Sequence, residues 1–230
     1  MLSTTVFESG ADRRIRTDDL LNTSQIFTWL CNAGGCTRRQ PFEDNRVTIS
    51  RAAGTMCFPA DFLLIAALNP CPCGYHGDPK RECRCAPLQV QRYRERISGP
   101  LLDRIDIHLE VGAVTYHEMA GKELGESSDS MRERVVQARE VQRQRFGKKS
   151  KVRCNARMSS KQIKTHCELD AAGEGMMQMA MTELNLSARA YDRILKVSRT
   201  IADLAGSEHV QAEHVAEAIQ YRTLDRSMWS

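Results

Sequence analysis

The sequence predicts an α/β region followed by an all-α domain. Short apolar runs alternate with turns from about Gln40 to Val114, as expected for strands joined by loops. After a polar stretch near Gly121 to Ser130, apolar residues recur at spacings of three and four, which is typical of amphipathic helices. A chain of 230 residues with 41% hydrophobic residues is long enough for one medium domain or two small ones.

Composition sets limits on location and partners. No apolar run approaches the roughly 18 to 20 residues that a membrane helix needs, and the N-terminus lacks a signal-peptide pattern, so we expect a cytoplasmic protein without membrane contact. The net charge of +4 is compatible with nucleic-acid binding but does not establish it. The nine cysteines are an odd number, which favours metal ligation or free thiols over a disulfide framework.

Residues 1–39 have no sustained hydrophobic period, and we leave them unassigned, as either a disordered segment or a reading-frame artefact. Cys31 and Cys36 lie in this segment. A C-x4-C pair without a second pair is more often two thiols than a metal site.

Three strands are expected between residues 40 and 120. The first is 47–49. The second, 62–68, is a continuous apolar run, which suits a strand covered on both faces in a parallel sheet. The third, 105–111, alternates apolar and polar residues and therefore has one exposed face.

Helices are expected from residue 131 to 226. The first spans 131–146, with Met131, Val135, Ala138 and Val141 on one stripe. Ser159 or Ser160 caps the next, and Ser187 caps a strongly periodic helix that Gly206 closes. The apolar positions of that helix are Tyr191, Ile194, Val197, Ile201 and Leu204, and the last helix carries Val215, Ala218, Ile219 and Arg222.

Four cysteines form the sharpest local pattern. Cys71, Cys73, Cys83 and Cys85 make two C-x-C pairs around a nine-residue loop that is rich in turn residues. Four thiolates suit a closed, tetrahedral, structural Zn²⁺ site, and a loop this short can bring the pairs together. His76 is an optional further ligand, and free or redox-active thiols remain the alternative.

Several longer motifs carry a resemblance to a known family. Gln40-Pro41-Phe42-Glu43-Asp44, Ser50-Arg51-Ala52-Ala53-Gly54 and Ala67-Leu68-Asn69-Pro70-Cys71-Pro72-Cys73-Gly74 resemble the YifB/ComM-type AAA+ ATPases related to magnesium chelatase subunit I. The resemblance continues through residues 97–106 and 187–204 and covers about Gln40 to Arg222. It implies that residues 40–120 are the back half of an AAA+ core, and that residues 131–226 are its helical lid.

The resemblance also implies roles for particular residues. Asn69 falls at the family's sensor-1 position, beside the γ-phosphate, although an Asn before Pro also starts ordinary turns. Arg104 falls at the arginine-finger position, which acts on a neighbouring subunit, although an ion pair with Asp103 or Asp106 is the plain alternative. Arg189 falls at the sensor-2 position, and Arg193, one turn later, is the second candidate.

Complete relatives are expected to bind ATP and Mg²⁺, to form a ring, plausibly a hexamer, and to act on DNA as branch-migration helicases. Insertion of a metal into porphyrin is the less favoured activity. The motif G-x-x-x-x-G-K-[ST] occurs nowhere in the sequence, so we expect no hydrolysis by this chain alone. A zinc-stabilised module that binds nucleic acid or protein without ATP is the alternative. Arg92, Arg94 and Arg96, around Tyr93, are candidates for phosphate contact, although such charges are usually only solvated.

Overall fold

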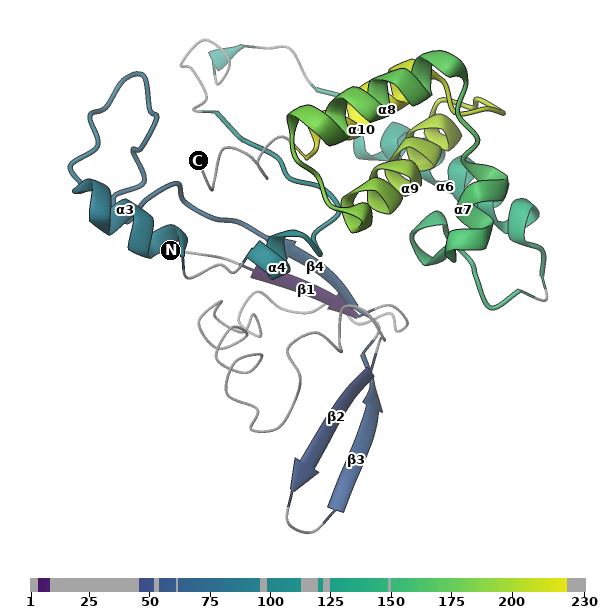
Figure 1. Ribbon diagram of the computed structural model, residues 1–230, viewed down its shortest axis with the longest axis horizontal. Coiled ribbons are helices and arrows are strands. Elements are labelled where there is room, and N and C mark those ends of the chain that lie inside the picture. The colour runs from purple at the N-terminus through teal and green to yellow at the C-terminus, as the bar shows by residue number, and fades with distance from the viewer. Residues whose placement is uncertain are drawn as a thin grey trace. The chain divides into compact units, whose positions relative to one another are not determined.

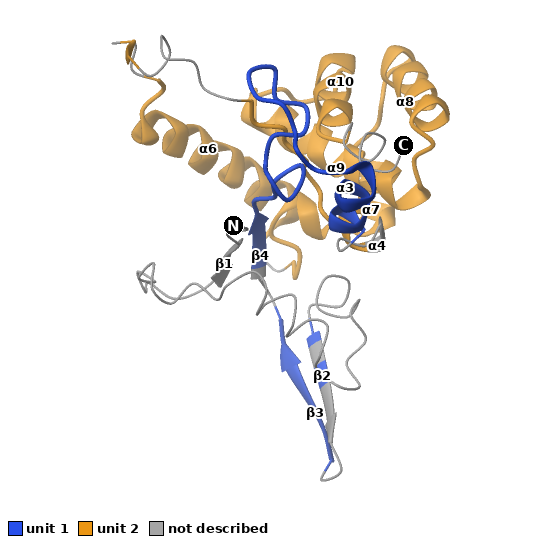
Figure 2. Cartoon of the chain, turned by 90° about the vertical axis from the view of Figure 1, so that its left-hand side faces the viewer, with its two compact units in different colours: residues 1–96 blue, residues 97–230 orange. Residues whose placement is uncertain are grey.

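The computed structural model describes residues 4–8, 46–51, 54–60, 62–95, 99–112, 120–121, 125–148 and 150–222. Figure 1 shows their helices and strands. The chain divides into two compact units between Arg96 and Ile97, coloured separately in Figure 2. Cys31, Cys36, Arg96 and the 40–44 motif lie outside the described residues.

The described residues of the first unit form two pairs of strands and one helix. Strand β1 (Thr4–Glu8) pairs with β4 (Phe62–Ala66), and β2 (Arg46–Arg51) pairs with β3 (Gly54–Pro59). Helix α3 (Pro87–Arg94) follows a long loop, and Pro87 fits its first turn because the amide that proline lacks has no partner there. The predicted strand 47–49 is therefore confirmed as part of β2, and β1 is an element that the sequence did not predict.

The predicted parallel sheet does not occur among the described strands, because both pairs are antiparallel. A parallel pair needs a crossover of about a dozen residues or more, whereas only two residues separate β2 from β3. The second predicted strand forms as β4, but its predicted burial is wrong. Leu63 is 57% exposed and Ile65 is 51% exposed, since the described strand β1 covers β4 along its edge and not its face.

The second unit is helical. After the short α4 (Gly99–Leu102) it contains α6 (Ser128–Phe146), the 3-10 turn η2 (Asn155–Arg157), α7 (Ser160–His166), α8 (Ala171–Glu183), α9 (Ala188–Leu204) and α10 (Ala212–Gln220). The predicted caps are confirmed. The hydroxyl of Ser159 accepts the Gln162 N–H at the start of α7, and that of Ser187 accepts the Ala190 N–H at 3.2 Å at the start of α9.

The described core of this unit gathers around α9 and α10. Its buried members run from Met158, just after η2, to Ala218 of α10, and partly buried residues such as Phe146 and Leu169 pack against them. The predicted stripe on α6 is only partly right, since Ala138 is 3% exposed but Met131 and Val135 are about half exposed. The core residues are Met158, Ile163, Cys167, Met177, Ile194, Leu195, Ala202, Val210, Val215 and Ala218.

The third predicted strand, 105–111, is wrong. This segment has no regular strand, and the face expected to be buried is exposed, with Ile107 at 47% and Leu109 at 65%. The polar His108 is buried instead, at 8% exposed, and its backbone N–H donates to the Tyr221 carbonyl at 2.8 Å. Hydrogen bonds to the end of α10 thus outweigh the alternating pattern.

None of the described helices has the length and hydropathy needed to cross a membrane.

Candidate functional site

The four predicted cysteine ligands come together in the first unit. The Sγ atoms of Cys71 and Cys73 are 3.3 Å apart, Cys71 and Cys83 are 3.7 Å apart, and Cys73 and Cys83 are 3.6 Å apart. Cys85 joins them, and all four sulfurs lie within 4.8 Å of one another. Cys71 is fully buried and the other three are partly buried. Among the described residues this set contains only thiols, and His76 is exposed outside it.

Glycines make the loop between the pairs possible. Gly74 has a φ of +84°, a conformation that side-chain-bearing residues rarely adopt, and its N–H donates to the Cys71 carbonyl at 3.0 Å. This turn folds the chain back over the first pair. The Asp78 carboxylate accepts the N–H groups of Lys80 and Arg81 and steers the loop toward the second pair. The Arg81 guanidinium then rests on the Tyr75 ring, 5.1 Å from its centroid.

The pKa values of Cys73 and Cys85 are shifted in opposite directions. Hydrogen bonds from the Tyr75 backbone, the Cys71 side chain and the Arg84 backbone lower the pKa of Cys73 to about 6. A backbone hydrogen bond from Cys73 acts to lower the pKa of Cys85, but removal from water and the neighbouring thiols raise it to about 12. The crowded sulfurs therefore resist carrying several negative charges together. A bound divalent cation relieves that repulsion and favours the thiolates.

The geometry fits a structural metal ion. Zn²⁺ binds thiolates at about 2.3 Å, which places the sulfurs of a regular tetrahedron about 3.8 Å apart. The three separations of 3.3 to 3.7 Å lie close to that value. Four protein ligands leave no open position for substrate or water, so the site can organise the loop but cannot do metal catalysis.

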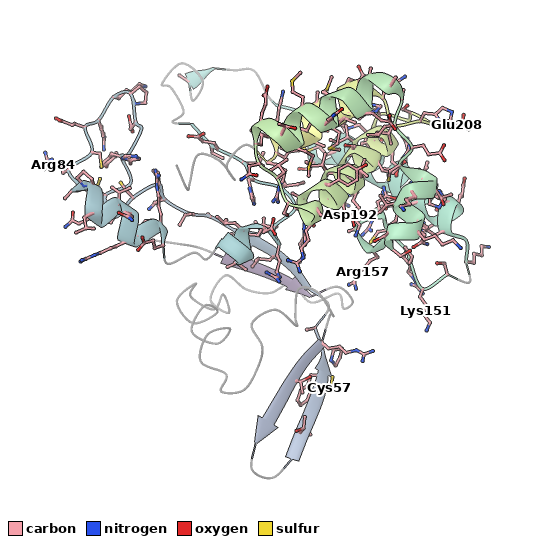
Figure 3. All side chains as sticks on the ribbon, in the orientation of Figure 1. Cys57, Arg84, Lys151, Arg157, Asp192 and Glu208 are labelled. Atoms are coloured by element: carbon pink, nitrogen blue, oxygen red, sulfur yellow. The ribbon has the colours of Figure 1, made fainter. Side chains whose placement is uncertain are left out.

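Other predicted residues of the first unit are exposed or tied locally. Asn69 lies three residues beyond the end of β4, and its side chain is exposed. Arg92 is exposed on α3, while the Arg94 Nε donates to the Pro70 carbonyl at 3.4 Å. Figure 3 shows Arg84, between the second pair of cysteines, projecting away from the loop.

A second constellation forms in the helical unit, where the segment around Arg104 meets the start of α9. The Ser187 hydroxyl, which caps α9, donates to the Asp103 carboxylate at 3.2 Å. Arg104 follows Asp103 directly, and its side chain is buried, at 8% exposed. The structure thus brings together two predicted motifs that are 84 residues apart in sequence, 101–104 and 187–189.

The two candidate arginines of α9 differ in their contacts. Arg193 forms an ion pair with Asp106, so its guanidinium is engaged within the chain. Arg189 is exposed in the first turn of α9, and within the described part of the chain no carboxylate pairs with it. Asn69 belongs to the other unit, so these contacts connect only the candidates of the helical unit.

Sequence reasoning missed the residue that holds this constellation in place. Arg222 is 1% exposed, donates to the Ile105 carbonyl, and lies 3.6 Å from the Asp103 carboxylate. The sequence pattern places Arg222 only in the last helix, without a role in the site. Its signal in the sequence is weak, since an arginine just after a helix usually lies in solvent.

Sequence comparisons agree with the motifs. The family model described as magnesium chelatase, subunit ChlI, matches residues 36–119, and the model of the ChlI C-terminal region matches residues 125–222. The chain is 42% identical to the competence protein ComM of Haemophilus influenzae over 189 residues. It is 39% identical to the uncharacterized protein YifB of Salmonella typhimurium and 38% identical to that of Escherichia coli. Each match covers 82% of this chain but 36% of the relative, so the chain spans about a third of the length of these curated relatives.

Proposed function

Because this chain belongs to the magnesium chelatase ChlI family and is of its YifB/ComM type, we propose that it is the C-terminal part of an AAA+ ATPase that remodels DNA. The observation that carries the proposal is the match to a competence protein across both family regions. The complete assembly is proposed to be a cytoplasmic ring, plausibly a hexamer, that uses ATP and Mg²⁺. Branch migration of recombining strands is the activity that best fits a role in competence.

Within this proposal Arg189 is the sensor of the γ-phosphate. It is exposed and unpaired among the described residues, whereas Arg193 is bound to Asp106. Because no described carboxylate pairs with Arg189, its guanidinium can approach a nucleotide without first breaking an ion pair. Arg193 then has a positioning role, since its ion pair ties α9 to the segment that follows Arg104.

Asn69 is proposed to orient the attacking water, and Arg104 to stabilise charge on the phosphoryl group of a neighbouring subunit's nucleotide. Arg104 is 8% exposed in this structure, so its guanidinium must be uncovered when subunits assemble. Its position beside Asp103, which contacts the cap of α9, supports a link between the finger and the sensor.

A chimera tests this proposal. Residues 36–222 replace the matching region of the Haemophilus influenzae relative, which supplies the rest of the ATPase. We expect Mg²⁺-dependent ATP hydrolysis, and a loss of roughly 10²-fold or more in Asn69→Ala, Arg104→Ala and Arg189→Ala variants. Arg193→Ala breaks the ion pair with Asp106 and should lose less than these three variants, whereas Arg139→Ala, which removes an exposed cation of α6, is the control that should keep its hydrolysis. Full hydrolysis by the Arg189→Ala chimera would remove the sensor assignment.

The four-thiol cluster supports a second candidate, a zinc-stabilised binding module that works without ATP. We expect the purified chain to carry one Zn²⁺, measured by elemental analysis, and a Cys73→Ser variant to lose it. Cys57→Ser changes an exposed cysteine outside the cluster and should retain the metal. DNA binding that needs zinc but is indifferent to nucleotide would favour this module over the ATPase part.

A further inference from the structure

The helical unit contains a basic run that none of the roles above uses. Residues 141–167 hold 9 of the 33 Lys and Arg residues of the chain and none of its 29 Asp and Glu residues. The remainder of the chain therefore has 24 cationic and 29 acidic side chains, and is net acidic. The modest total charge of +4 conceals this separation of charge.

The fold gathers this run into one region. The Oε1 atom of the Gln142 side-chain amide accepts the Asn155 backbone N–H at 3.2 Å, which brings the loop after α6 back onto that helix. The Phe146 ring meets the His166 ring edge-on, with centroids 5.7 Å apart, so the end of α6 also contacts the end of α7. These contacts make segments that are twenty positions apart in sequence neighbours in the fold.

A buried network fixes the two ends of the loop. Arg145 donates to Asn155 at 2.9 Å and to the Asp203 carboxylate on α9 at 2.7 Å, and Asn155 donates to the same carboxylate at 2.7 Å. Lys196 of α9 reaches the Ala156 carbonyl at 3.0 Å. The basic loop is therefore held on a rigid frame.

Most cations of the run point outward. Arg145 belongs to the buried network and Arg143 pairs with Glu140, but five other cations are exposed, and no carboxylate among the described residues pairs with them. Figure 3 shows one of the five, Lys151, directed away from the helices. The five are Lys148, Lys151, Arg153, Lys161 and Lys164.

We infer that this surface binds the phosphate backbone of nucleic acid. A run of exposed cations without a carboxylate fits a ligand with regularly repeated negative charge, because each cation can neutralise one phosphate and release a counterion. Base stacking has no support here, since Phe146 is the one Phe, Tyr or Trp in the run and packs within the unit. An anionic membrane fits less well, because the apolar Met158 and Ile163 are buried in the core. Binding of this kind is independent of base sequence. The inference rests on the proposed function, because it locates the surface with which the proposed ATPase holds DNA.

The test uses the 230-residue chain without nucleotide and measures its binding to a fluorescein-labelled 30-base-pair DNA duplex by anisotropy at several salt concentrations. We expect the Lys151→Gln/Lys164→Gln variant to bind roughly tenfold more weakly near 0.1 M salt. Its salt dependence, the slope of log K against log salt, should be lower by about 2. Arg132→Gln/Arg139→Gln removes two exposed cations of α6 outside the run and should change both quantities much less.

A second measurement does not depend on the variants. Bound DNA should protect Lys151, Lys161 and Lys164 from acetylation by acetic anhydride, read out by mass spectrometry. Equal weakening by the control variant, or labelling of these lysines that DNA does not change, would overturn the inference. So would binding to phosphatidylserine vesicles without binding to DNA. Because no ATP is present, a chimera without hydrolysis would contradict the proposed function and leave this result standing.

Discussion

Asp203 joins three elements of the helical unit through one buried carboxylate. Arg145 of α6 and Arg199 of α9 both donate to it, and Asn155 of η2 adds a third donor. Arg199 also donates to the carbonyls of Ser207 and Glu208, which extends the network to the loop before α10. A buried charge with this many partners is costly to disturb, because removing it leaves two guanidinium groups without compensation.

Asp203→Asn is therefore expected to destabilise the chain by about 3 kcal/mol or more near pH 7. Burial alone would raise the pKa of Asp203, but hydrogen bonds from Arg145 and Asn155 and the charge of Arg199 lower it below its ordinary value of 3.8. The stabilisation is thus complete above pH 3.8 and is lost as the pH falls through the lower folded-state value. Urea unfolding of both proteins between pH 2 and 7 measures this.

Glu140→Gln is the matched control, because it removes a carboxylate from an ion pair whose two side chains are 65% and 51% exposed. It should cost less than about 1 kcal/mol at any pH. A stability difference between Asp203→Asn and the parent chain that stays constant down to pH 2 would contradict the assignment.

At the scale of elements, the segment 103–108 depends on α10 and the residues just after it. Arg222 donates to the Ile105 carbonyl, and the His108 N–H donates to the Tyr221 carbonyl. Arg222→Gln shortens the side chain and removes its charge, so we expect the His108 amide to exchange with deuterium at least about tenfold faster. Hydrogen-exchange mass spectrometry of the peptide covering 103–112 measures this.

Lys161→Gln provides the comparison, since Lys161 is an exposed residue of α7 and belongs to neither the segment nor α10. Unchanged protection of 103–112 in Arg222→Gln would mean that Arg222 does not hold the segment. Faster exchange of every helix in the unit would instead indicate general unfolding, and the variant would then say nothing specific about this docking.

Helices were far easier to predict from the sequence than strands. The starts of α7 and α9 follow from Ser159 and Ser187, because capping depends on a hydroxyl and on backbone groups two or three residues away. The prediction for 105–111 is wrong because its alternation looks like a strand, while a hydrogen bond from the His108 N–H to the Tyr221 carbonyl and one from Arg222 to the Ile105 carbonyl decide its conformation. Interactions between residues more than a hundred positions apart leave no local pattern.

The candidate sites also differ in how far the sequence alone could predict them. The cysteine cluster was predictable because all four ligands lie within fifteen residues, where spacing alone limits the geometry. The basic run was readable as a stretch without acids, but a net charge averaged over 230 residues hides it. The choice between Arg189 and Arg193 needed the structure, because both occur on the same helix and the position of Asp106 distinguishes them.

For the whole molecule, the two units differ in what stabilises them. The described hydrophobic core cluster lies entirely in the second unit, from Met158 to Ala218. In the described part of the first unit the buried apolar side chains are those of Cys71 and Val90. A region that buries so little apolar surface is expected to need a cross-link or a metal ion to stay ordered.

Removal of the proposed zinc ion should therefore affect the first unit selectively. With a strong chelator at neutral pH, we expect peptides covering 69–95 to lose their protection from hydrogen exchange, while peptides of α9 and α10 keep theirs. Added Zn²⁺ should restore protection in the parent chain but not in Cys73→Ser, and Cys57→Ser should behave like the parent. If α9 lost its protection to the same extent as the loop, the metal would support both units and the chain would fold as one cooperative body. Protection that follows the metal only in 69–95 would mean that the cysteine loop is an independently switched element, ordered by zinc while the helical unit keeps its own core.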